Sequence, residues 1–192
     1  MAVSAAGALL QYTKDMQYDA VPHIVDFSIT QKSDFLVIDA ASRQNLEIET
    51  NLSGGSKFTL VALMDKCANP MGGRLLRRWL HGPITNQVEL AHRQLAVGEF
   101  IDRLDQAAVH RLLRQCGDVE RILTRIALGT ARPRDLTRLR TALQCLPAIH
   151  NEISTGESEL LKSLRTKFGP FTTSQQLLLS LIHISEPTRH RR

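Results

Sequence analysis

Helix start and stop signals follow one another from about residue 60 onward, and they constrain the fold of this chain more than any other feature. Asn69-Pro70 combines an N-cap residue with a proline at the first helical position, and Gly82-Pro83 is a stop signal. Aromatic residues make up only 5% of the 192 residues, so the core must consist of Leu, Ile, Val and Ala. This composition favours helices over a β-sandwich.

Further helices are predicted by the same reasoning. Asn86 opens one helix, whose buried stripe we expect at Val97, Phe100, Ile101 and Leu104, and Asp118 caps another after a break near Gly117. Arg132-Pro133 restarts the chain as a long helix, which we expect to kink or end at Pro147. The leucines of this helix are spaced by three, four and three residues, which is typical of a packed seam: Leu136, Leu139, Leu143 and Leu146.

The N-terminal region follows a different period. Residues 2–19 predict a helix, after which Val25–Ile29 alternates apolar and polar residues and Asp34–Asp39 is a compact apolar run. We interpret these two runs as the strands of a hairpin. The predicted fold class is therefore mainly α, a long-helix bundle with a short β-hairpin near the N-terminus.

No motif in the sequence predicts an enzyme. The glycine-rich loop Asn51–Thr59 lacks the second glycine of a P-loop and is interpreted as a helix-to-helix turn. The histidines show no metal-binding spacing, the three cysteines form no C-x-x-C, and the serines lie in no G-x-S-x-G. We therefore expect no catalytic residue, no bound cofactor and no metal ion in this chain.

Arginines are the most informative charged residues, since the net charge of +5 permits a nucleic-acid partner without requiring one. On the helix from Pro70 to His81, one face carries Arg74, Arg77 and Arg78, and the opposite face carries Leu75, Leu76, Trp79 and Leu80. A second group consists of Arg132, Arg134, Arg138 and Arg140. Two interpretations stay open: contacts with the phosphates of a DNA backbone, or solvated helix faces.

A mixed cluster of charges lies between the predicted helices, and it consists of Asp118, Glu120, Arg121 and Arg125. Such clusters most often tie helices together. No apolar run is long enough to cross a membrane, and the cysteine usage fits a reducing compartment, so we expect a cytoplasmic protein.

Several short motifs follow one another in a specific order along the chain. They are ASRQNLEI (41–48), NLSGG (51–55), TLVALMD (59–65), PMGGRLLRRWL (70–80), Arg93-Gln94, GDVERILTRIAL (117–128) and ARPRDL (131–136). Each motif alone is weak, but their order and separations together are specific over about residues 1–170. In this order the chain resembles the MutS family of bacterial DNA mismatch-repair proteins.

The resemblance implies a function as well as a fold. Residues 1–22 resemble the end of the connector domain, and residues 23–178 resemble an incomplete helical core or lever domain. The intact family binds mismatched duplex DNA as a homodimer, uses ATP and Mg²⁺ to switch to a sliding clamp, and recruits a MutL-type partner. The lever couples DNA binding to the ATPase and has no active site of its own. We expect its stiffness to come from the leucine seam and from the apolar face around Trp79.

The chain also departs from the family pattern. The mismatch-reading Phe-x-Glu, the clamp and the Walker motif of the ATPase are absent, so we expect a fragment that is not an enzyme. Residues 179–192 resemble the translation of a transposase mosaic-end adapter used in sequencing libraries, and we expect them to be non-native. The alternative to a lever fragment is a stand-alone basic helical module that binds nucleic acid through its arginines.

Overall fold

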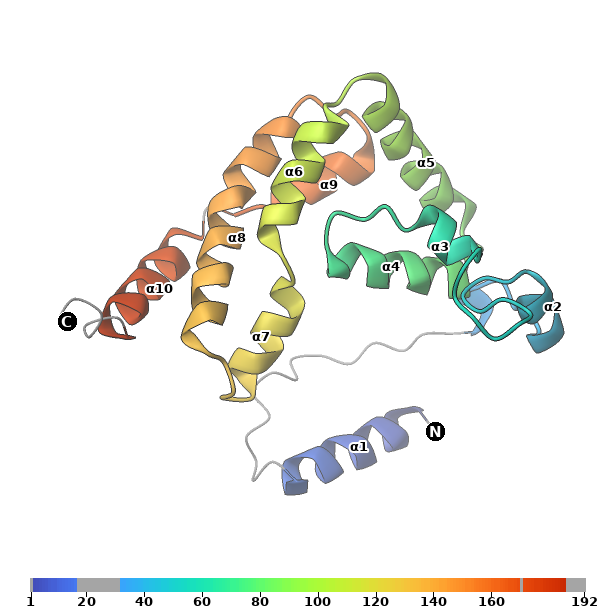
Figure 1. The fold of residues 1–192 in the computed structure, drawn as a ribbon, viewed down its shortest axis with the longest axis horizontal. Coiled ribbons are helices and arrows are strands. Elements are labelled where there is room, and N and C mark those ends of the chain that lie inside the picture. The colour runs from blue at the N-terminus through green and yellow to red at the C-terminus, as the bar shows by residue number, and fades with distance from the viewer. Residues whose placement is uncertain (1, 17–31, 170, 186–192) are drawn as a thin grey trace.

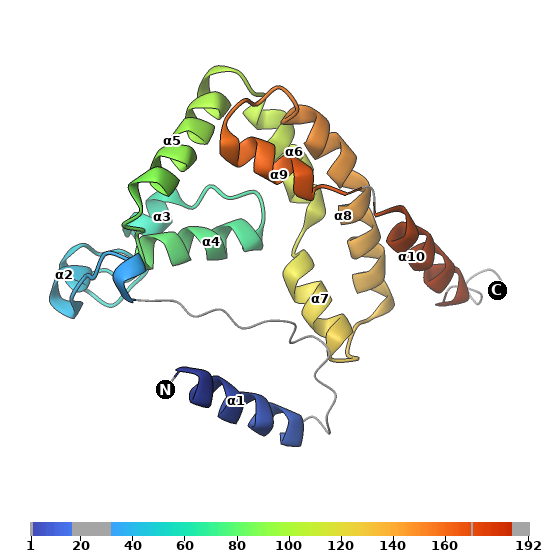
Figure 2. The same cartoon turned by 180° about the vertical axis from the view of Figure 1, so that it is seen from behind.

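The computed structural model of the chain describes residues 2–16, 32–169 and 171–185. These residues are mainly helical, as predicted, and α1 stands apart from the other helices in both views (Figures 1 and 2). The elements are α1 (Ala2–Met16), the 3-10 turn η1 (Lys32–Asp34), α2 (Ala40–Asn45), α3 (Leu60–Met64), α4 (Pro70–His81), α5 (Gln87–Asp102), α6 (Gln106–Cys116), α7 (Val119–Ala127), α8 (Pro133–Glu152), α9 (Glu159–Lys167) and α10 (Thr172–Ser185).

The 20-residue helix α8 is the centre of the larger helical layer. α6 packs along its C-terminal half and α7 along its N-terminal half, while α10 lies on its other side (Figures 1 and 2). Two apolar clusters hold this layer together. One joins Cys116 of α6 to Ala142, Cys145 and Ile149 of α8, and the other joins Ile122 of α7, Leu139 of α8 and Leu178 of α10. The buried face of α8 therefore serves three partner helices.

A smaller cluster joins α5 to α9 through Ala96, Leu104 and Leu161. Next to it, the Glu99 carboxylate of α5 accepts hydrogen bonds from the backbone N–H groups of Glu157 (3.0 Å) and Ser158 (2.8 Å). The N-cap residue of α9, Ser158, makes no side-chain capping bond, because its hydroxyl also donates to Glu99 at 3.1 Å, so a side chain from another helix satisfies the backbone donors at this end of α9.

The predicted N-terminal hairpin is not seen. Residues 25–29 lie outside the described residues, and Asp34–Asp39 forms no regular strand among them. Instead, Phe35 makes an isolated antiparallel bridge with Ile84, and the Leu36 N–H donates to the Pro83 carbonyl at 2.8 Å. Asp34, the first residue of the predicted strand, belongs to η1, and the backbone partner of Phe35 lies in the stop signal after α4, about fifty residues further along the chain.

Pro147 does not end its helix, because α8 continues to Glu152. A proline has no N–H, so the carbonyl four residues earlier, that of Leu143, loses its helical donor. The side-chain amide of Gln175 on α10 donates to this carbonyl at 3.3 Å. The proline therefore leaves a free acceptor on α8, and the neighbouring helix uses it.

Among the described residues, no helix is both long enough and apolar enough to cross a membrane.

Candidate functional site

Helix α4 carries a polar stripe of three side chains, Arg74, Arg77 and His81, spaced so that all three lie on one side of the helix. Its start is fixed by Asn69, whose side-chain oxygen accepts the Gly72 N–H at 3.0 Å, and by the proline that follows. Each side chain of the stripe meets at least one carboxylate from another element. α4 is therefore an anchor to which other parts of the chain are tied.

The C-terminal part of the stripe is tied to the segments on either side of α3. The Arg77 guanidinium lies 3.3 Å from a Glu49 oxygen and 3.2 Å from an Asp65 oxygen. Gly73 allows this approach, because a Cβ there would lie 3.1 Å from both the Arg77 and the Asp65 side chains. A side chain at this buried glycine would therefore crowd the ion pair that passes over it.

His81 extends this network to α2. Its Nδ1 lies 2.6 Å from Nη1 of Arg43, and its Nε2 lies 2.7 Å from a Glu49 oxygen. A guanidinium can only donate, so Nδ1 must accept and the proton of a neutral His81 ring sits on Nε2, where it donates to Glu49. The ring orientation is therefore defined from both sides.

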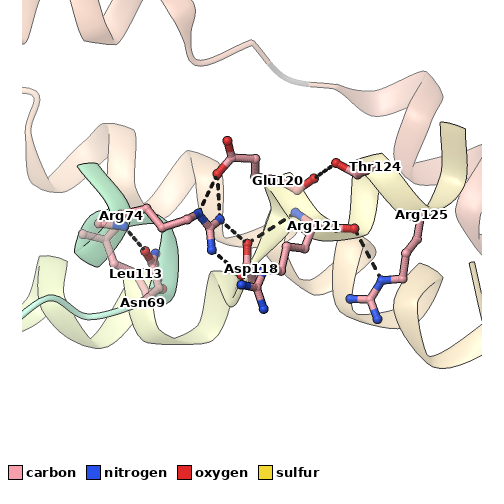
Figure 3. A network of polar contacts seen from close by, with 9 residues as sticks. Asn69, Arg74, Leu113, Asp118, Glu120, Arg121, Thr124 and Arg125 are labelled. Atoms are coloured by element: carbon pink, nitrogen blue, oxygen red, sulfur yellow. Dashed lines mark hydrogen bonds and ion pairs between the residues drawn. The ribbon is translucent and has the colours of Figure 1, made fainter. Parts of the chain in front are cut away.

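The N-terminal part of the stripe spans the break between α6 and α7 (Figure 3). Gly117 separates these helices with a φ of +66°, a conformation that favours glycine. Beyond it, the Arg74 guanidinium makes two hydrogen bonds to Asp118 (2.7 and 2.9 Å) and reaches Glu120 at 2.6 Å. Asp118 is the N-cap of α7, so Arg74 holds the first turn of that helix.

The other side of the break is held by Asn69. Its amide nitrogen donates to the Leu113 carbonyl in the last turn of α6 at 3.2 Å, while its oxygen caps α4 (Figure 3). Asn69 therefore contacts α6 on one side of Gly117, and Arg74 contacts α7 on the other side. We call this set of contacts, made by Asn69 and Arg74 with Leu113, Asp118 and Glu120, the α4 splint.

The positive charges around the splint favour the ionised form of the Asp118 carboxyl. The hydrogen bonds from Arg74 lower the pKa of the Asp118 carboxyl below its ordinary value, and the Arg121 N–H and guanidinium act in the same direction. The two Asp118 carboxylate oxygens thus have donors from α4 and from α7. The sequence cluster around Asp118 was expected to tie helices together, and it does so through Arg74, 44 residues earlier.

The structure gives the predicted arginines different surroundings. Arg74 and Arg77 are occupied by ion pairs, and Arg78 is exposed. Of the opposite face, Leu76 and Leu80 are half-buried, while Leu75 and Trp79 are each 41% exposed. The Arg93 guanidinium lies 4.2 Å from the centre of the Trp79 ring, so this ring makes a cation–π contact.

The predicted leucine seam lies at the centre of the α8 layer. Leu139 is 7% exposed, and Leu136 and Leu143 pack half-buried against the same cluster with Ile122 and Leu178. Leu146 packs against the cluster formed with α6. The most buried side chains of α8 also include one charge, Asp135, which accepts the Arg132 N–H at 3.1 Å and lies 3.5 Å from Arg125 of α7.

Several residues of these networks were missed by sequence reasoning. Glu49 and Asp65 were not singled out, because no periodicity marks an acid whose partner is distant in sequence. Glu99 gave no signal either, because Ser158 before α9 is itself a preferred N-cap residue and does not indicate a second acceptor. In the described part of the chain, no group of three or more His, Cys, Asp and Glu side chains is arranged to hold a metal ion.

The fold and the splint together define a helical structural domain, in which charged residues join helices. A family model for MutS domain III matches residues 41–192 of this chain. The chain therefore belongs to the MutS family of DNA mismatch-repair proteins, as its motif order indicated. Domain III is a different part of these proteins from their ATPase domain.

Proposed function

We propose that this chain is the lever segment of a mismatch-repair protein, through which DNA binding is coupled to a distant ATPase. In this proposal the intact protein binds mismatched duplex DNA as a homodimer, switches to a sliding clamp with ATP and Mg²⁺, and recruits a MutL-type partner. In this proposal ATP and Mg²⁺ bind outside the segment, which contributes stiffness and carries out no reaction.

The observation that supports this proposal most strongly is the α4 splint. A lever transmits a displacement only if no joint along it absorbs the motion. The α6–α7 break at Gly117 is the weakest point of the layer, because two short helices meet there at a glycine. Contacts on both sides of the break from one rigid helix make α6 and α7 move together.

The test uses a MutS protein that carries this segment as its domain III. Arg74→Gln removes the ion pairs with Asp118 and Glu120 at the start of α7 and leaves the Asn69 contact with α6 in place. We expect the change in ATPase rate caused by mismatched DNA to shrink several-fold, while DNA affinity and the ATPase rate without DNA stay the same. Arg103→Gln is the matched control, since it also removes one arginine charge, from an exposed position near the end of α5.

Asp118→Asn addresses the same contact from the other side and keeps an N-cap residue. The proposal predicts that both variants reduce the coupling and that combining them adds little, because they share one interaction. Unchanged coupling in both variants, with circular dichroism spectra like that of the parent, would show that the splint transmits nothing.

A further inference from the structure

The strongest unexplained feature of the molecule is an arginine patch, formed by Arg121 and Arg125 of α7 and Arg134 and Arg138 of α8. Residues 106–152 hold eight arginines, no lysine and four acidic residues, so this segment has a net charge of +4 within a chain of +5. In both helices the two patch arginines are four residues apart and therefore share one face.

The two pairs lie on adjoining helices. α7 lies alongside the N-terminal half of α8 in both views (Figures 1 and 2), and the ion pair between Arg125 and Asp135 crosses from one helix to the other. Asp135 is next to Arg134 in sequence and one turn before Arg138. Arg121, Arg134 and Arg138 are exposed, and the side chain of Arg125 is 41% exposed.

Among the residues that the structure describes, the carboxylates beside the patch do not balance its charge. Asp118 is bound at 2.7 Å by Arg74 and reaches Arg121 only at 3.5 Å, and the single carboxylate of Asp135 serves Arg125. Like charges four residues apart destabilise a helix by a few tenths of a kcal/mol per pair. Two such pairs on adjoining helices are a stability cost that an anionic partner would remove.

We propose that the arginine patch binds the phosphate backbone of duplex DNA. Arginine presents a planar fork of donors that matches a phosphate, and the patch contains no lysine. Residues 106–152 contain no Phe, Tyr or Trp to serve as a stacking platform for bases, so we expect contacts with the backbone. The proposal goes beyond the lever function and does not depend on it.

The test measures binding of a fluorescent 30-base-pair duplex to the full 192-residue chain by anisotropy, across a range of KCl concentrations. Arg134→Gln with Arg138→Gln should weaken binding about tenfold or more at low salt. The same variant should reduce the slope of log affinity against log salt by about 2. Arg134→Lys with Arg138→Lys keeps the charge and should keep most of the slope.

Lys57→Gln with Arg103→Gln is the matched control, because it also removes two exposed positive charges, away from the patch. It should leave affinity and slope close to those of the parent. Three results would overturn the proposal: no salt-dependent binding by the parent chain, an equal loss in the control, or a loss in the lysine variant as large as in the glutamine variant. Equally tight binding of poly-glutamate would reassign the patch to an acidic protein. Since no ATPase is measured, these results are independent of the lever test.

Discussion

Leu139→Ala tests whether α8 is the packed centre of the layer. Leu139 is 7% exposed and contacts a cluster contributed by α7, α8 and α10. The substitution removes three carbon atoms, which is about 2.4 kcal/mol of transfer free energy at about 0.8 kcal/mol for each. A cavity between three helices collapses poorly, so the total loss should be about 3–4 kcal/mol of unfolding free energy.

The assay is urea unfolding followed by circular dichroism at 222 nm, together with thermal melting. For a chain of this size the loss corresponds to a fall in Tm of about 10 °C. Leu123→Ala is the matched control, because Leu123 lies on α7 beside the same cluster but is 51% exposed, and it should cost about 1 kcal/mol or less. Equal losses in the two variants, or a loss below about 1 kcal/mol for Leu139→Ala, would refute the packing argument.

Three further outcomes follow from the contacts described above. Gly156→Ala should cost about 1–3 kcal/mol in the same unfolding assay, because the new Cβ would lie 2.5 Å from a buried leucine carbon. Arg74 lowers the pKa of Asp118, so the ionised Asp118 carboxylate stabilises the fold at pH values above its ordinary pKa. This stabilisation is lost as the pH falls below about 4. Asp118→Asn should therefore make the free energy of unfolding depend less on pH in that range. A disulfide reagent at pH 8 should label exposed Cys67 before the two buried cysteines, which should react only at the rate of unfolding. Desolvation and the neighbouring Asp65 raise the pKa of Cys67, so its labelling should be slower than that of a free thiol, and burial raises the pKa of Cys116 to about 11.

Helix boundaries were the most predictable part of the fold, because they depend on local chemistry. The start signal at Asn69-Pro70 and the stop at Gly82 bound α4 as predicted, and Asn86 and Asp118 cap α5 and α7. Each cap acts on backbone groups two or three residues away, so the pattern contains all the information needed.

The buried face of a helix was harder to predict when two apolar stripes overlap. On α5 the predicted stripe contained Val97 and Ile101, but these side chains are 58% and 68% exposed, and Ala96 is buried with Leu104. A small alanine lets α9 approach closely, whereas hydrophobicity alone favours the larger residues one position later.

Partners distant in sequence were beyond prediction. Arg74 was correctly expected on a polar face of α4, yet nothing in its own neighbourhood indicates Asp118 and Glu120 as its acceptors. The same holds for Phe35, whose bridge to Ile84 replaces the expected hairpin. Such pairings are set by tertiary packing, which brings groups together without leaving a local period in the sequence.

The central position of α8 has a consequence for how the layer opens. α6 and α7 have 11 and 9 residues, fewer than the roughly 12–15 at which an isolated helix becomes even marginally stable in water. α8 is about 30 Å long, and the buried faces of both shorter helices rest on it. Their amide protons should therefore exchange with solvent only in openings that also release α8, which makes the three helices one cooperative unit.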